Sequence, residues 1–256
     1  MTPGSAVPLF AAGGFHYLPG VFQYSAGVAA AAGHRLQRVR FSEPLPMDEA
    51  FELVEEFLGD VGRPTEAFCA CELRSPAPFS EAGFFAFNTE YAEQLGRWGL
   101  LADGVNPVAR TNICPAVDPP AVPSMHAFTF TLPEPDEAAL ASFVIAGSGE
   151  SIEGKATYEE TIVALGDTTP AGIAHKAAFV LDEMERRLAG FGKGWADCTT
   201  VDLYTVYDAY PVLGTLFAER RAWSDGVTWH WSRPPVAQID FEMDCRRIGI
   251  ELLLEI

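Results

Sequence analysis

The fold is decided by two stretches of sequence, Phe84-Phe-Ala-Phe-Asn88-Thr-Glu-Tyr91 and Asn106-Pro-Val-Ala-Arg110-Thr-Asn112. The first lies in a segment, residues 82–98, whose apolar side chains recur with the period of a helix. The second follows a proline-containing loop and opens a strand, so Arg110 stands at the start of that strand. A guanidinium fixed there can bind a small carboxylate through two hydrogen bonds. The alternative interpretation is a structural or surface arginine in a turn.

Composition limits the classes of function. The chain has 256 residues, 48% of them hydrophobic and 20% charged, which is typical of a globular protein. Its formal net charge of −18 disfavours nucleic acid as a partner, because such a surface repels phosphates. No apolar run is long enough to cross a bilayer and no secretory signal is recognisable at Met1, so we expect a cytoplasmic protein without a membrane partner.

Cysteine and histidine spacing gives no sign of a metal site. The five cysteines follow no metal-binding pattern and are expected to be buried, reduced side chains. The five histidines show no HxH or HxxxH spacing. The lysines, Lys155, Lys176 and Lys193, lie in turn-like or helical segments where we expect them to be exposed, so a Schiff-base mechanism has no good candidate.

The pattern of elements occurs twice along the chain. Residues 47–61 and 168–191 carry helical apolar stripes, which end at Gly62 and Gly192. Each helix is followed by a predicted strand (67–73 and 198–206), a second helix (82–98 and 211–221) and closing strands (from Arg110 and 124–132; 236–244 and 248–256). Strands are also predicted before each first helix, at 22–28 with 37–41 and at 143–146 with 161–165. We therefore predict an α+β protein of two tandem β-β-α-β-α-β-β domains, residues 1–134 and 135–256, with helices packed on one face of a mixed sheet.

The order of these elements resembles the Rid (reactive intermediate deaminase) family, whose domains have a chorismate mutase-like fold. The first half matches the family motifs at Ser25-Ala-Gly27, Asn88-x-x-Tyr91 and Pro107-Val-Ala-Arg110-Thr111. The resemblance covers the whole chain as two copies, although each motif is short. It implies hydrolysis of enamine or imine acids, such as 2-aminoacrylate or a 2-aminomuconate, to a keto or enol acid and ammonia. It also implies a homo-oligomer built like the Rid trimers, with sites between domains, and a reaction that needs no cofactor.

The resemblance also implies the site residues. Arg110 would bind the substrate carboxylate, backbone groups near Asn112 would hold water, and Tyr17, Gly27, Asn88 and Thr111 would line the pocket. The family glutamate of the last strand is replaced in this alignment by His126, which we assign to acid–base catalysis, with an edge-capping histidine as the alternative. In the second half Arg233 is out of register and Gly249 takes the glutamate position, with Glu251 two residues on, so we expect that half to be structural.

Two other functions fit the sequence less fully. A protein that only binds carboxylate ligands, or that acts in regulation, would retain Arg110 without the glutamate. A nuclease, an activity attributed to some Rid proteins, is disfavoured by the net charge of −18.

Overall fold

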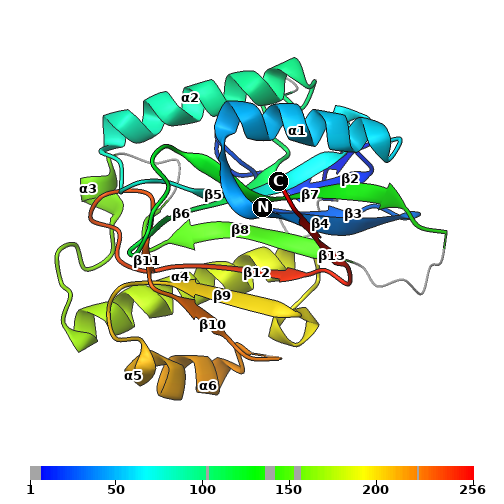
Figure 1. Cartoon of the computed structure of the whole chain (residues 1–256). Coiled ribbons are helices and arrows are strands. Elements are labelled where there is room, and N and C mark those ends of the chain that lie inside the picture. The colour runs from blue at the N-terminus through cyan, green and yellow to red at the C-terminus, as the bar shows by residue number, and fades with distance from the viewer. Residues whose placement is uncertain (1–6, 102–103, 136–141, 153–156, 224) are drawn as a thin grey trace.

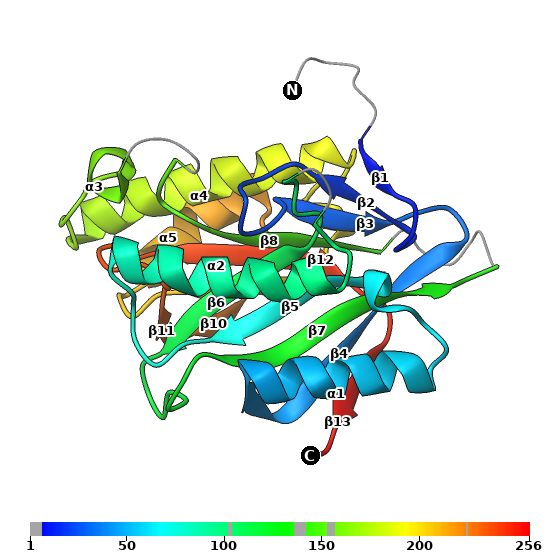
Figure 2. The ribbon, with the colours of Figure 1, turned by 90° about the horizontal axis from the view of Figure 1, so that it is seen from above.

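The computed structural model describes residues 7–101, 104–135, 142–152, 157–223 and 225–256. Within these residues the strands form two sheets that lie against each other, with helices on the outer faces (Figures 1 and 2). The first sheet has the order β1-β2-β3-β8-β12-β9-β10 and the second β11-β6-β5-β7-β4-β13. Both sheets mix parallel and antiparallel pairs, which confirms the α+β class.

The strands of the first sheet come from both ends of the chain. They are β1 (Leu9–Phe10), β2 (Phe15–Leu18), β3 (Gly27–Ala30), β8 (Phe143–Gly149), β9 (Thr200–Tyr204), β10 (Thr228–His230) and β12 (Glu242–Arg247). The second sheet likewise receives two strands from the second half of the chain. Its strands are β4 (His34–Pro46), β5 (Phe68–Arg74), β6 (Ala109–Pro115), β7 (Ser124–Pro133), β11 (Ser232–Arg233) and β13 (Glu251–Leu254). The proposed division at residue 134 stays a prediction, with strands exchanged across it.

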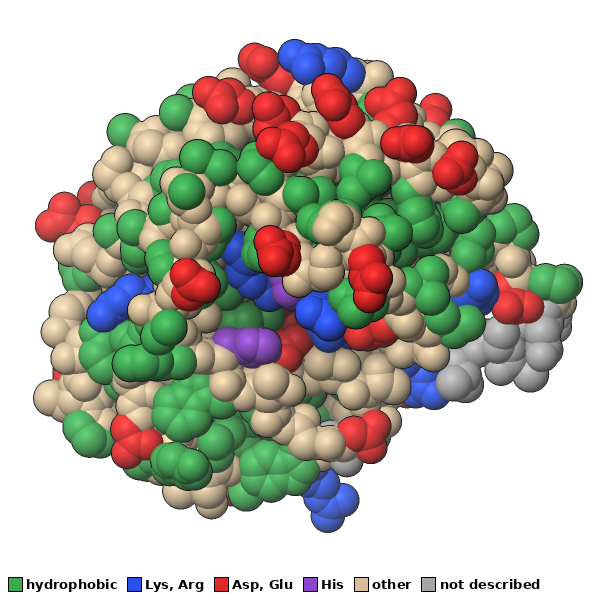
Figure 3. Space-filling view, in the orientation of Figure 1, with side chains coloured by type: hydrophobic (Ala, Val, Ile, Leu, Met, Phe, Trp, Pro, Cys, Tyr) green, Lys and Arg blue, Asp and Glu red, His purple; other side chains and the backbone are tan. Residues whose placement is uncertain are grey.

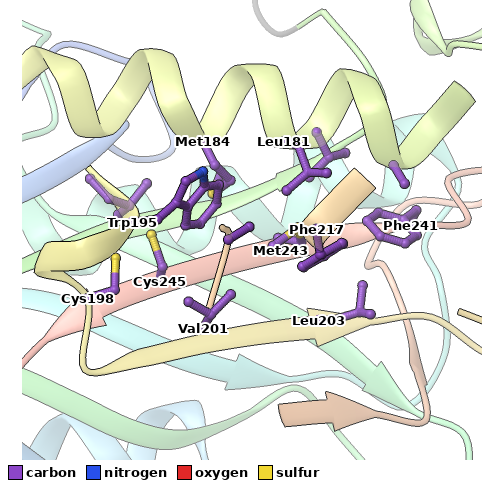
Figure 4. Packing of buried hydrophobic residues seen from close by; sticks show 14 of the residues in the cluster. Leu181, Met184, Trp195, Cys198, Val201, Leu203, Phe217, Phe241, Met243 and Cys245 are labelled. Carbon is purple, nitrogen blue, oxygen red and sulfur yellow. The ribbon is translucent and has the colours of Figure 1, made fainter. Parts of the chain in front are cut away.

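The helices cover the outer faces of the sheets. Helices α1 (Met47–Asp60) and α2 (Glu81–Arg97) pack on β4, β5 and β7, through a core that contains Phe51, Val54 and Phe128. Helix α4 (Pro170–Gly190) packs on β8, β9 and β12 through Leu181, Met184 and Met243 (Figure 4). Smaller helical segments complete the fold: η1 (Thr65–Ala67), α3 (Tyr158–Thr161), η2 (Trp195–Asp197), α5 (Tyr210–Val212), the π-helical turn η3 (Leu213–Phe217) and α6 (Ala218–Arg220).

The connection from α1 to β5 and the connection from α4 to β9 have the same local geometry. Gly62 and Gly192 both have positive φ, 69° and 66°, a conformation that glycine adopts at little cost. The next amide, of Arg63 or Lys193, donates to a carbonyl in the last turn, and a short 3₁₀ turn then leads into β5 or β9. These glycines end the helices where the sequence places them.

Three predicted strands are wrong in whole or in part. Residues 22–26 form turns and isolated bridges before β3, and residues 236–241 form a turn and irregular chain before β12. Residues 161–165 were expected to be extended, but Thr161 ends the short helix α3 and a turn follows it. Ala164 and Gly166 have φ values of 48° and 73°, which no strand accommodates. No described helix is long and apolar enough to cross a membrane.

Candidate functional site

Arg110 lies on β6 and is almost completely buried, with 3% of its surface exposed. Its neighbour across the parallel pair is Cys71 of β5. Four aromatic rings surround the guanidinium carbon at 4.8–5.8 Å from the ring centroids: Tyr91, Tyr24, Phe87 and Phe84. Such rings attract a cation and restrict its rotation. Atom Nη1 of Arg110 is buried and has no hydrogen-bond partner. The rings thus hold the guanidinium in place, but one of its donors lacks an acceptor.

Helix α2 supplies three of these rings because of its periodicity. Ser80 caps the helix by accepting a hydrogen bond from the amide of Gly83, and Phe84, Asn88 and Tyr91 then recur at intervals of four and three residues. Asn88 is completely buried, and neither of its amide atoms has a partner. A buried amide without hydrogen bonds is rare in proteins and indicates a site that a ligand completes.

Arg110 opens into a cavity of about 40 Å³, here called the Arg110 cavity. Residues from both halves of the chain line it: Tyr24, Phe84, Arg110, Asn112, Gly147, Gly149, Ser151, Tyr158, Pro235, Val236, Ile239 and Glu242. Asn112 accepts a hydrogen bond from Oγ of Ser75 at 3.0 Å, while its Nδ2 is buried without a partner. The cavity thus presents two kinds of unsatisfied donor, a guanidinium and an amide.

The carboxylate in the cavity is Glu242, at the start of β12, which the sequence analysis did not identify. Its backbone pairs with Gly149 of β8, and its side chain lies over Gly147, where a Cβ would collide with Oε1 of Glu242. A sequence signal for it exists. Met243 and Cys245 are core residues, so Glu242, Asp244 and Arg246 must share the other face of the strand.

The structure brings together only part of the predicted site. Arg110 and Asn112 line the cavity, and Asn88 lies on the helical face that covers Arg110. Five predicted residues are not among those that line it: Tyr17, Gly27, Asn88, Thr111 and His126. Tyr17 pairs with Val28 in the first sheet, Gly27 lies close to the carbonyl of Val144, and Oγ1 of Thr111 accepts a hydrogen bond from the amide of Gly147.

His126 lies on β7, two strands away from β6, and is not among the residues that line the Arg110 cavity. Burial and the positive charge of Arg74 together lower its pKa to about 3, against the effect of Glu72. The ring is therefore neutral near pH 7 and a weak base. Its assignment to acid–base catalysis stays a prediction.

His126 is next to an ion-pair network between the two sheets. The network consists of Arg38, Glu72, Arg74, Asp202, Asp244, Arg246 and Glu251. Glu251 joins the sheets, at 3.2 Å from Nη1 of Arg38 on β4 and 3.4 Å from Nε of Arg246 on β12. Figure 3 shows charged and histidine side chains in a hollow near the centre of one face. Arg233, the second candidate arginine, is exposed on β11.

The lysines differ from expectation. Lys176 is completely buried in α4, beside Glu150 and Asp240, and not exposed as its place in a helix suggested. Its helical position is correct, but a buried carboxylate pair on neighbouring elements was not visible in the sequence. Lys193 is partly buried, and Lys155 lies outside the described residues. Within the described part of the chain no group of three or more His, Cys, Asp or Glu side chains is placed to hold a metal ion.

Comparisons with known proteins show the family of the chain. The model of the 2-aminomuconate deaminase CnbZ family matches residues 7–252. A 2-amino-5-chloromuconate deaminase of Comamonas testosteroni is 50% identical over 246 residues, which are 96% of this chain and 98% of the relative. A chorismatase crystal structure covers 86% of this chain, and 77% of its own, with a TM-score of 0.51 and 14% identity, a likeness of fold alone. The chain therefore belongs to the 2-aminomuconate deaminase CnbZ family.

Proposed function

We propose that this protein hydrolyses a conjugated 2-amino acid of the 2-aminomuconate type to a 2-oxo acid, or its enol, and ammonia. The observation that carries the proposal is the buried, incompletely bonded guanidinium of Arg110 in the same cavity as the carboxylate of Glu242. Membership of a deaminase family and the name of the 50% identical relative support the same class of substrate.

Arg110 binds the substrate carboxylate. A carboxylate facing Nη1 would satisfy the buried donor and neutralise a cation that the aromatic rings hold in one place. Nδ2 of Asn112 offers a second donor in the same cavity. The rings of Phe84 and Tyr158, in edge-to-face contact with centroids 6.4 Å apart, give the cavity an aromatic wall for the carbon chain of the substrate.

Glu242 moves the protons. In the protonated imine tautomer, carbon 2 is electrophilic. A water oxygen forms a bond to it, the C=N π electron pair moves to nitrogen, and Glu242 accepts a proton from that water. The resulting carbinolamine carries a hydroxyl and an amino group on carbon 2. Glu242 returns its proton to the nitrogen, the C–N bond breaks with its electron pair on nitrogen, and ammonia leaves. Glu242, again a carboxylate, takes the hydroxyl proton as the C=O bond forms and passes it to the departing ammonia, which leaves as ammonium. The reaction as written requires no cofactor.

The proposal includes the Rid-like architecture. We retain residues 1–134 and 135–256 as two Rid-like domains, because the Arg110 cavity is lined by Arg110 and Phe84 from the first segment and by Tyr158 and Glu242 from the second. A site between domains is what the family resemblance implies. The trimeric assembly stays a prediction.

Ammonia release from freshly generated 2-aminomuconate and 2-aminoacrylate tests the function. We expect wild-type turnover to exceed the buffer rate, and Arg110→Ala to lower kcat/KM on the order of a hundredfold, because a buried charge pair is lost. Arg233→Ala, at an exposed arginine, serves as the matched control. No acceleration by the wild type would indicate a protein that only binds carboxylates. Full turnover by Arg110→Ala would place the site elsewhere.

A further inference from the structure

Three buried charged side chains meet beside the Arg110 cavity without lining it. Glu150, which follows β8, and Lys176 of α4 are completely buried, and Asp240, which precedes β12, is nearly so. Nζ of Lys176 lies 3.4 Å from Oε1 of Glu150 and contacts Oδ2 of Asp240. This Lys176 cluster therefore joins three elements that are far apart in sequence.

Glu150 also fixes the backbone that precedes Glu242. The two oxygens of Glu150 accept hydrogen bonds from consecutive amides, Oε1 from Asp240 at 2.7 Å and Oε2 from Phe241 at 3.0 Å. These amides directly precede Glu242. Gln238, just before them, has a φ of 76°, which a residue other than glycine adopts only where its surroundings enforce it. The shape of the segment that leads into Glu242 thus depends on Glu150.

The residues on either side of the cluster line the cavity. Gly149 and Ser151 flank Glu150 in sequence, and Ile239 flanks Asp240, while Glu242 follows two residues later. Arg110, by contrast, is on β6 of the second sheet, with its guanidinium among four aromatic rings. The cluster is thus bonded to the segment that carries Glu242 and not to the strand that carries Arg110.

We propose that Lys176, Glu150 and Asp240 are positioning residues that hold the carboxylate of Glu242 over Gly147, facing the substrate that Arg110 binds. The inference rests on the proposed function and assigns a role to the one buried lysine of the described residues. It is consistent with the pKa of Glu150, which burial raises to about 7 while the two amides and Lys176 oppose the rise. Without Lys176 the Glu150 carboxyl takes up a proton more readily, and a neutral acid is a weaker acceptor for the two amides.

Kinetics of two substitutions test the proposal. We expect Lys176→Met and Glu150→Gln each to lower kcat for 2-aminomuconate at least about tenfold, because small displacements of a catalytic group are costly. KM should change less than about twofold, since the carboxylate-binding Arg110 keeps its surroundings. Lys193→Met, a lysine substitution outside the cluster, is the matched control and should resemble the wild type. If Lys176→Met does not fold, the isosteric Glu150→Gln decides.

Amide hydrogen exchange provides a readout that does not depend on activity. Peptides covering residues 238–243 should exchange faster in Lys176→Met than in the wild type, with no change in peptides covering β6. A lower thermal midpoint with unchanged kcat and unchanged exchange would show a stabilising role only and would overturn the inference. If the wild type has no turnover, the proposed function fails, and the exchange rates alone decide whether the cluster fixes this segment.

Discussion

At the scale of single residues, Gly147 makes room for a carboxylate. A Cβ at this position would collide with Oε1 of Glu242 and press on Thr111. We predict that Gly147→Ala folds, because the far end of Glu242 can rotate away, but lowers kcat at least about tenfold by misplacing that carboxylate. Gly59→Ala is the matched control, since nothing lies within 4 Å of its Cβ position in α1. It should keep wild-type kcat and gain about 0.5–1 kcal/mol in unfolding free energy.

The two glycine variants are compared by steady-state kinetics and by urea unfolding. Wild-type kcat in Gly147→Ala would mean that the Glu242 carboxylate can act from another place, and would weaken its assignment as the proton carrier.

Some residues of the site belong to short sequence motifs and others do not, and this decides which could be predicted from the sequence. Arg110, Asn88 and Asn112 could be predicted because each sits in a short motif with a recognisable place on a helix or a strand. Glu242 was missed. Alternation gives its face on β12, but not that this strand of the other sheet reaches the cavity. For His126, the alternation of side chains along the strand predicts which face of the sheet the residue lies on. It does not predict which cavity or which charged groups lie next to that face. For His126 that face meets Arg74 and Glu72.

At the scale of elements, α2 carries a polar residue on its buried face. Both amide atoms of Asn88 lack partners, and an unsatisfied buried amide costs about 1–3 kcal/mol. We therefore predict that Asn88→Leu leaves the unfolding free energy unchanged or higher, while KM for the amino acid substrate rises because a polar contact is lost. Glu93→Gln, at an exposed position of the same helix, is the control for both measurements. A loss of about 2 kcal/mol in Asn88→Leu with unchanged KM would instead show a structural amide.

Element types were predictable from local periodicity, but their partners were not. Helices α1, α2 and α4 lie within a residue or two of their predicted bounds, because apolar stripes, caps and terminal glycines are local signals. The exchange of β1–β3 into the first sheet and of β13 into the second depends on pairing between distant segments. Such pairing leaves no periodic trace in the sequence of either strand.

At the scale of the whole molecule, the two sheets meet through charges as well as through apolar packing. Ala70, Ala109 and Ala146 form part of a small apolar cluster between them, and the ion-pair network lies alongside. His126 is embedded next to that network with a pKa lowered from 6.5 to about 3 by burial and by Arg74. Below pH 6.5 the unfolded chain therefore binds a proton that the folded protein does not.

This difference in proton binding gives a test of how the sheets respond to acid. The contribution of His126 to stability is complete above pH 6.5 and is lost as the pH falls toward 3, amounting to about 2 kcal/mol between pH 7 and pH 5. In His126→Gln this loss should be absent, so its unfolding free energy should fall by about 2 kcal/mol less than that of the wild type over the same interval. Urea unfolding at both pH values measures the difference, with His175→Gln as the control for an exposed histidine. Equal losses in wild type and His126→Gln would mean that His126 is protonated in the folded protein, where it would then be available for acid–base work after all.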